Sequence, residues 1–263
     1  MKKLIALLMT IALIVSCFAG CGSTEADKLI IVAEKESAGE GVAKTLNDYA
    51  YTAVDTQAKA LMEVAAGTAD AAIVDYVMSI GSIGEGTDYE NLVIKGEGYS
   101  PENYGIAFRK GSDATAKVNE AIKQLLDSGK LAEIANKYKL GELITATEEF
   151  EEFKQAATDS DWAYIQEKGE LIIGITYFAP MNYKDDNGEL IGFETEFAKA
   201  VCEVLGVTAK FQEISWAAKE TELAAKNIDC IWNGMTITEE RAENMSITIP
   251  YMANKQVMVV KDK

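Results

Sequence analysis

Met62–Val77, MEVAAGTADAAIVDYV, and Thr221–Thr236, TELAAKNIDCIWNGMT, follow the same pattern in two distant parts of the chain. Each segment reads as a helix that ends in Ala-Ala, a short turn, an aspartate (Asp70 or Asp229) and then four apolar or small residues. A helix followed by a buried strand, repeated in both halves of a chain, predicts two α/β lobes.

The two predicted strands end at equivalent residues, Asp75 and Gly234. In open α/β sheets, ligands bind just outside the carboxyl ends of the strands. Asp75 and the stretch Asn233–Arg241 would therefore face one shared crevice between the lobes. Strands alternate with helices along most of the remaining chain, which indicates mostly parallel sheets with helices on their faces.

The chain opens with MKKLIALLMTIALIVSCFAGCGSTEAD, in which two lysines and an apolar run precede small residues and a cysteine. This pattern is typical of a secretory signal with a lipoprotein-type cleavage site, because the apolar run is short for a membrane-spanning helix. We expect residues 1–20 to be a signal peptide, Cys21 to carry the lipid, and residues 21–26 to form a tether. Cleavage before Cys17 and an uncleaved anchor are the alternatives.

The composition is acidic, with a formal net charge of −17 over 263 residues and no histidine. Such a chain is a poor partner for nucleic acid, whose phosphates need basic patches. Cys202 and Cys230 follow the leader, and the sequence leaves open whether they are buried thiols or a disulfide. Because neither a Cys-x-x-Cys pair nor a Cys/His cluster occurs, we expect no metal site.

Two sets of segments resemble the two halves of a known family. Gly169–Val207 and Asn227–Val260, with the motifs GELIGFETEFAKAV and GMTITEER, resemble the amino-terminal half of the family 3 solute-binding proteins, which feed amino acids to ABC importers. Leu29–Leu46, Gly67–Asp75 and Tyr104–Glu142, with the motif YGIAFRKGSD, resemble the carboxyl-terminal half of that family. The order of the halves is reversed, so the resemblance implies a circular permutation.

The resemblance implies a two-lobed, periplasmic-binding-protein-like (type II) α/β fold, in which each lobe has a mixed, mostly parallel sheet flanked by helices. Residues 27–108 would form one lobe and residues 109–263 the other, with an acidic connector at 142–169. The new chain ends would lie at the hinge. We expect a single covalent crossing near Phe108 to Gly111, and therefore a softer hinge that still closes.

The resemblance also assigns the two charges of a free amino acid. Arg241, with its bidentate fork, would bind the α-carboxylate, and Asp75 from the other lobe would pair with the ammonium. Both ligand charges need partners because they leave water when the lobes close. Thr236 would offer an N–H group and a hydroxyl, Gly234 would offer its carbonyl, and Thr238 would cap the following helix.

Further contacts follow from positions in the family motifs. Phe178 and Trp216 would sandwich the ligand side chain, with Tyr177 as a weaker candidate. The N–H groups of Ser37 and Ala38, at a helix start, would point at the carboxylate.

Two polar residues, Asn233 and Glu34, would reach the ligand side chain. A carboxylate at Glu34 suits a cationic amino acid or a neutral polar one, and the sequence leaves both open. Glu36 stands where the family usually has a glycine.

The resemblance implies an extracytoplasmic lipoprotein, anchored to the outer face of the cytoplasmic membrane, that binds a small-molecule amino acid and delivers it to the membrane subunits of an ABC importer. We expect a monomer without a cofactor, and no catalytic residues, because no histidine, activated nucleophile or phosphate loop is visible. A lipoprotein that presents ligand to a signalling receptor and an enzyme on the same fold are the alternatives. Ligand binding would shift an equilibrium between open and closed lobes.

Overall fold

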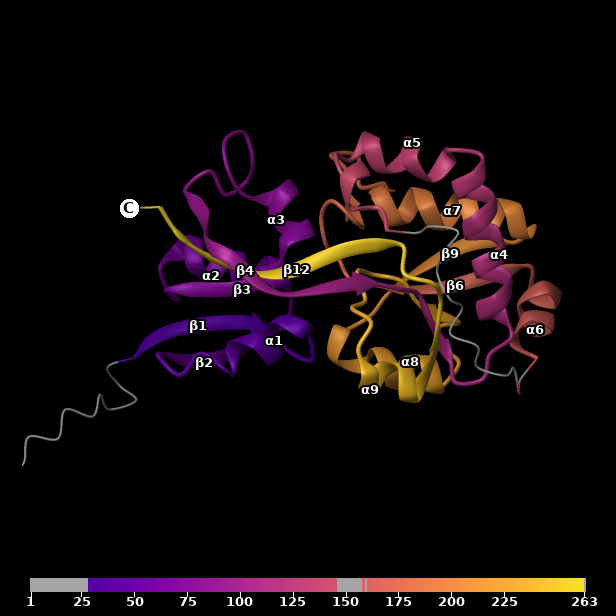
Figure 1. Ribbon diagram of the computed structural model, residues 1–263, viewed down its shortest axis with the longest axis horizontal. Helices are drawn as coiled ribbons and strands as arrows, with labels where there is room; N and C mark the ends of the chain where they lie inside the picture. The colour runs from indigo at the N-terminus through magenta and orange to yellow at the C-terminus, as the bar shows by residue number, and fades with distance from the viewer. Residues whose placement is uncertain (1–27, 146–157, 159, 263) are drawn as a thin grey trace, which may run out of the picture.

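The computed structural model describes residues 28–145, 158 and 160–262. These residues form two α/β lobes, each with a five-stranded sheet and helices on its faces (Figure 1). The predicted signal peptide, the lipid at Cys21, the tether and part of the acidic connector lie outside the described residues. No helix among the described residues is long and apolar enough to span a membrane.

The first lobe is built from both ends of the described chain. Its sheet has the order β2-β1-β3-β12-β4, in which β1 runs parallel to β2 and β3, and β12 runs antiparallel to β3 and β4. Val32, Leu61 and Val74 are among its buried core residues. Its elements are β1 (Leu29–Glu34), α1 (Ala38–Ala43), β2 (Tyr49–Val54), α2 (Gln57–Ala66), β3 (Ala71–Asp75), α3 (Tyr76–Ser82), β4 (Leu92–Tyr104) and β12 (Met252–Lys261).

The second lobe holds the middle of the chain. Its sheet has the order β9-β6-β10-β5-β11, with β6 parallel to β9 and β10, and β5 antiparallel to β10 and β11. Its elements are β5 (Ala107–Arg109), α4 (Ala114–Asp127), α5 (Lys130–Lys137), η2 (Gly141–Leu143), α6 (Asp161–Lys168), β6 (Glu170–Ile175), β7 (Tyr183–Lys184), β8 (Leu190–Ile191), α7 (Phe193–Leu205), β9 (Thr208–Glu213), η3 (Trp216–Ala218), α8 (Lys219–Ala224), β10 (Cys230–Ile231), α9 (Glu239–Asn244) and β11 (Met245–Ile247).

The two sheets have the same order and the same strand directions, as the internal similarity predicts. β3 and β10 hold the same place in their sheets. The aspartate before each strand makes the same bond: Asp70 Oδ2 accepts from the Ile30 N–H at 2.7 Å, and Asp229 Oδ2 accepts from the Ile172 N–H at 2.7 Å. Each aspartate thus fixes its strand to the neighbouring parallel strand.

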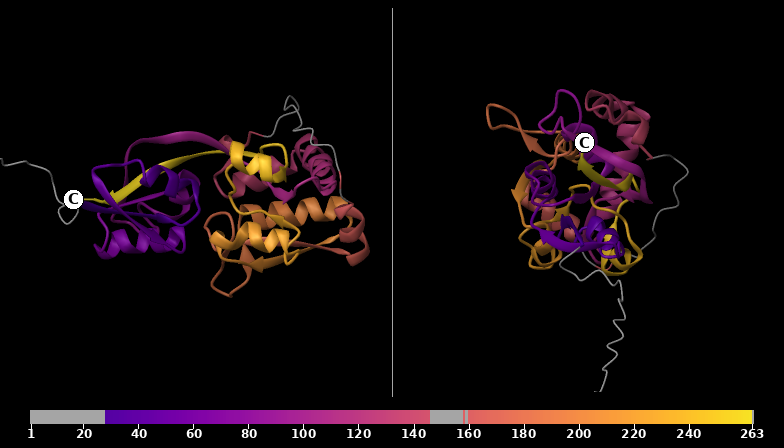
Figure 2. Two further views of the ribbon diagram at one scale, coloured as in Figure 1. Left: turned by 90° about the horizontal axis from the view of Figure 1, so that it is seen from below. Right: turned by 90° about the vertical axis from the view of Figure 1, so that its left-hand side faces the viewer.

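The lobes are joined by two covalent crossings, so the expectation of a single crossing is wrong. One crossing leads from β4 to β5 and the other from β11 to β12, and both run along the same side of the molecule (Figure 2). They are hydrogen-bonded to each other, because the Thr248 N–H donates to Ile106 O at 2.9 Å and the Tyr251 N–H donates to Tyr104 O at 3.0 Å. β12 therefore belongs to the first lobe, which corrects the predicted lobe of residues 109–263.

The start of β1 and the end of β12 lie at the far edge of the first lobe, away from the crossings (Figure 1). This follows from the sheet, in which β3 separates β1 from an antiparallel β12. The expectation that the chain ends lie at the hinge is therefore wrong.

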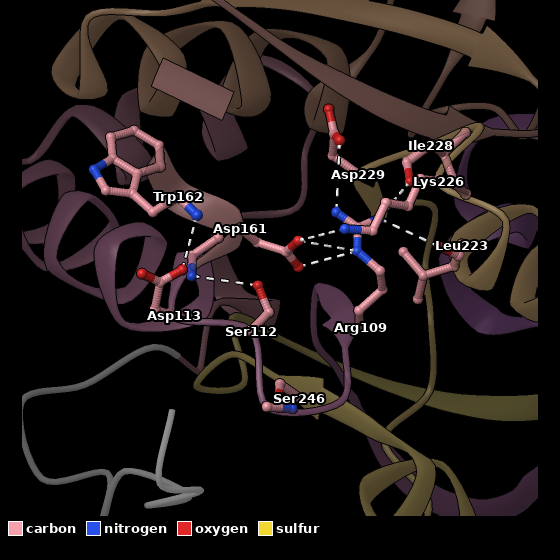
Figure 3. A network of polar contacts seen from close by, with 12 residues as sticks. Arg109, Ser112, Asp113, Asp161, Trp162, Leu223, Lys226, Ile228, Asp229 and Ser246 are labelled. Atoms are coloured by element: carbon pink, nitrogen blue, oxygen red, sulfur yellow. Dashed lines mark hydrogen bonds and ion pairs between the residues drawn. The ribbon is translucent and has the colours of Figure 1, made fainter. Parts of the chain in front are cut away.

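A buried ion cluster holds α6, within the predicted connector, to the sheet of the second lobe (Figure 3). Arg109 Nε donates to both carboxylate oxygens of Asp161, at 3.0 and 3.2 Å, and Nη1 donates to Ile228 O at 2.9 Å. Asp229 lies 3.7 Å from Arg109 and 2.5 Å from Lys168. Both aspartates are almost fully buried, so the surrounding cations offset the cost of taking these carboxylates out of water.

Candidate functional site

A cavity lies between the facing edges of the two lobes, with walls from both. It is small, about 20 Å³, which is room for about one water molecule. The sequence-predicted site residues all lie around it. The first lobe contributes Glu34, Ser37, Ala38, Gln57 and Asp75, and the second contributes Thr176, Tyr177, Phe178, Trp216, Asn233, Gly234, Thr236 and Arg241.

Asp75, the last residue of β3, is buried and held by three side-chain amides. Gln57, from the start of α2, donates to Oδ2, while Asn254 and Gln256 of β12 donate to Oδ1. Burial raises the pKa of the Asp75 carboxyl, and the hydrogen bonds from Gln57 and Gln256 oppose the rise. Because a carboxylate can accept about four hydrogen bonds, the three amide donors leave about one place open on Asp75.

Asn254 and Gln256 also donate to Oε1 of Glu102, which places a second carboxyl behind Asp75. Burial and the charge of Asp75 raise the pKa of Glu102 to about 7. Glu102 belongs to β4, so three strands of the first lobe together support the acidic side of the site.

Glu34, the last residue of β1, lies beside the end of β3, because Ala33 pairs with Ile73 in a parallel register. Its side chain is only 4% exposed, and Oε1 has no hydrogen-bond partner among the described residues. Burial and the neighbouring Asp75 charge raise the pKa of Glu34 to about 8. Glu34 therefore lies in the wall of the cavity and not at a solvated rim.

Arg241 of α9 contacts both lobes. Nη1 donates to Thr236 O of its own lobe at 2.8 Å, and Nη2 donates to Glu36 O of the first lobe at 3.2 Å. The guanidinium lies over the Trp216 ring at 6.0 Å from its centroid. Thr238 caps α9, as predicted, because its hydroxyl accepts from the Arg241 N–H at 3.2 Å. The cap fixes the turn that presents the guanidinium to the cavity.

The Glu36 carbonyl accepts the hydrogen bond from Arg241, and the Glu36 backbone has a conformation that is more favourable for glycine. Its φ is 61°, in the left-handed region that side chains disfavour by about 1–2 kcal/mol per residue. Its carbonyl also accepts from Lys219 Nζ at 3.3 Å. Arg241 and Lys219 of the second lobe thus hold this turn of the first lobe. Their hydrogen bonds stabilise the Glu36 backbone conformation in the absence of the expected glycine.

Phe178 and Trp216 are buried in the second-lobe wall, and Tyr177 lies at its exposed margin. Gly234 passes so close to Phe178 that an added Cβ would lie 2.6 Å from Cε1 of the ring. Glycine is needed there because its φ is also +55°.

Glu194, at the start of α7, fixes the loop behind the cavity. It is fully buried, and Oε1 accepts from the Gly234 N–H at 2.8 Å and from the Tyr251 hydroxyl. Burial raises its pKa to about 7, against the effect of these hydrogen bonds. Tyr251 lies in the second crossing, so Glu194 links the site loop directly to the hinge.

Two expected ligand contacts have other partners in this structure. The side-chain amide of Asn233 donates to Thr176 O at 3.0 Å and to Asn182 Oδ1 at 2.8 Å, and its oxygen accepts from the Thr176 hydroxyl at 2.6 Å. The Ser37 N–H donates to Glu34 O at 3.2 Å, in the turn that leads into α1, and the Ser37 side chain caps that helix. Asn233 and the Ser37 amide therefore shape the wall of the cavity.

Sequence reasoning missed the residues that support the site, among them Gln57, Thr176, Asn254 and Gln256 in the first contact layer and Glu102, Glu194 and Lys219 further out. Gln57 follows the helix cap Thr56, and this cap signal could have placed it at the carboxyl edge of the sheet. Thr176 directly follows β6. Asn254 and Gln256 had no such signal, because β12 was assigned to the other lobe.

Cys202 and Cys230 are both buried free thiols, which decides the alternative that the sequence left open. Burial raises the pKa of both thiols.

Within the described part of the chain, no three His, Cys, Asp or Glu side chains form a group that could hold a metal ion. The lining of the cavity presents groups that carry charges of both signs, the Glu34 and Asp75 carboxyls and the Arg241 guanidinium.

Comparison with known proteins identifies relatives over part of the chain. Residues 171–263 match the family model of the bacterial extracellular solute-binding proteins, family 3. The L-cystine-binding protein TcyJ of Escherichia coli (strain K12) is 29% identical over 133 residues, which cover 50% of each chain. A probable amino-acid ABC transporter-binding protein of Haemophilus influenzae is 32% identical over 120 residues, which cover 45% of this chain and 46% of the relative.

Among solved structures, the arginine-bound form of domain 1 from TmArgBP is 31% identical, with a TM-score of 0.33. The match covers 37% of this chain and 84% of that domain. The chain spans about half the length of the curated relatives it matches.

Proposed function

We propose that this chain is a member of the bacterial extracellular solute-binding proteins, family 3, whose family model its residues 171–263 match. We further propose that it binds a free amino acid in the cavity between its lobes and delivers it to an ABC importer. The proposal rests on one observation: Arg241 of the second lobe and Asp75 of the first lobe line the same cavity. A guanidinium and a carboxylate on opposite walls complement a zwitterion, with Arg241 on the α-carboxylate and Asp75 on the ammonium.

The geometry supports binding by closure. An amino acid is much larger than a cavity for one water molecule, so the lobes separate to admit it and close around it. The bonds from Arg241 and Lys219 to Glu36 O are among the contacts between the lobes, and they must break when the lobes separate. We propose that the closed form is read by the membrane subunits of the importer, and that lipid on Cys21 keeps the protein at the outer face of the membrane.

The first test is a thermal-shift screen of the twenty amino acids, with cystine and ornithine, on the protein without its leader. Binding to the folded state raises the melting temperature by mass action, by an amount that grows with ligand concentration. At least one amino acid is expected to give such a shift, and a uniformly negative screen would contradict amino-acid binding.

The Arg241→Ala variant tests the site itself. An unpaired buried charge costs about 3–5 kcal/mol, so calorimetry should show a loss of affinity of at least about 100-fold. Arg241→Lys keeps the charge without the fork and is expected to recover part of the affinity. If the Arg241→Ala variant bound the ligand with wild-type affinity, the assignment of Arg241 to the ligand α-carboxylate would be wrong.

We also propose that the chain is a circular permutation of the family order. In support, the start of β1 and the end of β12 lie at the same edge of one sheet, where permuted ends are tolerated. A variant that joins residue 262 to residue 28 by a short linker and opens the chain within 146–157 should fold and bind the same ligand. Failure of this variant to fold would count against the permutation.

A further inference from the structure

The charges that line the cavity exceed those of a simple zwitterion. Among the described residues, the lining contains two carboxyls, Glu34 and Asp75, and one guanidinium, Arg241. A zwitterion with an uncharged side chain occupies Arg241 and one carboxyl. The other carboxyl would remain in the closed site without a partner, which is costly for a buried acidic group.

Glu34 is the carboxyl with free capacity. Its Oε1 has no hydrogen-bond partner among the described residues, although the side chain is almost fully shielded from solvent. Asp75, by contrast, already accepts from Gln57, Asn254 and Gln256, and one remaining place suffices for a single N–H of an α-ammonium.

Lys219 is the nearby cation that could satisfy Glu34 without a ligand. Its Nζ donates to Glu36 O at 3.3 Å and lies 4.9 Å from the centroid of the Trp216 ring. Lys219 lines the adjoining groove, whereas the residues described around the cavity do not include it. Its charge acts on Glu34 only from a distance, and the Oε1 atom stays without a hydrogen-bond partner among the described residues.

We propose that the ligand is a cationic amino acid, with a second positive group on its side chain that pairs with Glu34. This inference rests on the proposed function and adds the chemical class of the ligand. Two positive groups and one carboxylate on the ligand complement the two carboxyls and one guanidinium of the lining. Glu34 is then the residue that selects a charged side chain over a neutral one of the same shape.

Binding of a cation beside Glu34 is coupled to the loss of a proton. The groups that face Glu34 are Asp75 from β3, which raises its pKa, and Lys219 from α8 and Gln57 from α2, which lower it. With burial, the balance brings the pKa to about 8, so the empty site holds a proton on Glu34 at pH 7. A cationic ligand displaces that proton, and its affinity should rise from pH 6 to pH 8.

The test compares ligands that match in shape and differ in charge. Calorimetry at pH 7 measures L-arginine against L-citrulline, and L-lysine and L-ornithine against L-glutamine. In the wild-type protein, at least one cationic ligand should bind tenfold or more tightly than its neutral counterpart. Glu34→Gln should lose this preference and still bind the neutral ligand. Glu213→Gln, an exposed glutamate that ends β9, removes the same charge away from the cavity and should keep the preference.

The two proposals fail in different ways. If a neutral amino acid binds wild type as tightly as the cationic ones, the inference is overturned and amino-acid binding stands. If no amino acid binds wild type, both are overturned. Should Glu34→Gln fail to fold, wild-type calorimetry in two buffers of different ionisation enthalpy decides: proton release with the cationic ligand supports the inference, and its absence overturns it.

Discussion

At the residue scale, the site depends on backbone positions that leave no room for a side chain. Gly234 combines a φ of +55° with a would-be Cβ 2.6 Å from Phe178. Gly234→Ala should therefore displace the ring and weaken amino-acid binding by about tenfold, besides costing about 1–2 kcal/mol of stability for the left-handed backbone. Gly206→Ala is the control, because its φ is +72° and nothing lies within 4 Å of the added Cβ. It should lose stability alone; equal loss of affinity in both variants would contradict the account.

Residues that end a strand could be placed from the sequence, and residues that act through a distant partner could not. Asp75 and Glu34 end β3 and β1, so strand ends and family motifs together brought them to the cavity. Asn233 lines the cavity, but its side-chain amide is hydrogen-bonded to Thr176 and Asn182. The hydrogen bond between Asn233 and Asn182 could not be predicted from a local sequence pattern, because Asn182 belongs to a separate loop.

At the element scale, Arg109 is expected to hold α6 and β10 to the second-lobe sheet through Asp161 and Asp229. Arg109→Met leaves both buried aspartates short of a partner, so urea denaturation should show about 3–5 kcal/mol less stability. Lys117→Met removes an exposed pair with Glu120 and should cost less than about 1 kcal/mol. A loss for Arg109→Met as small as that of the control would show that the cluster is not needed.

The element that the sequence misplaced is β12. The sequence analysis assigned all of residues 109–263 to one lobe. The apolar residues of β12 can pack in either sheet, and only the tertiary pairing with β3 and β4 decides between the two. Several other elements were recognised because alternation and helix caps are local signals, whereas α3 and β11 were not predicted. α7 and the Thr238 cap of α9 are examples of recognised features.

At the scale of the whole molecule, buried carboxyls make the stability depend on pH. Burial raises the pKa of Glu34 to about 8, and those of Glu102 and Glu194 to about 7. The folded protein therefore keeps protons that the unfolded chain, in which a glutamate has its ordinary pKa of 4.5, has already released. Between pH 5 and pH 7 the unfolded state binds fewer protons, so the free energy of unfolding must fall as the pH rises.

Chemical denaturation of the ligand-free protein at pH 5, 6 and 7 measures this slope. Glu194→Gln removes one of the three carboxyls and should flatten it. Stability that rises from pH 5 to pH 7 in the wild-type protein would contradict the buried, protonated state of these groups.

Two hydrogen-bonded crossings join the two lobes, which must separate and close. The central claim is that the lobes close on a free amino acid held by Arg241 and Asp75. The most direct test is a crystal structure of the protein with the amino acid found by the thermal-shift screen. We predict one ligand between the lobes, with its carboxylate on the Arg241 guanidinium and its ammonium on Asp75. A ligand that contacts only one lobe, or that leaves Arg241 on Glu36 O and Asp75 without a ligand contact, would contradict the account.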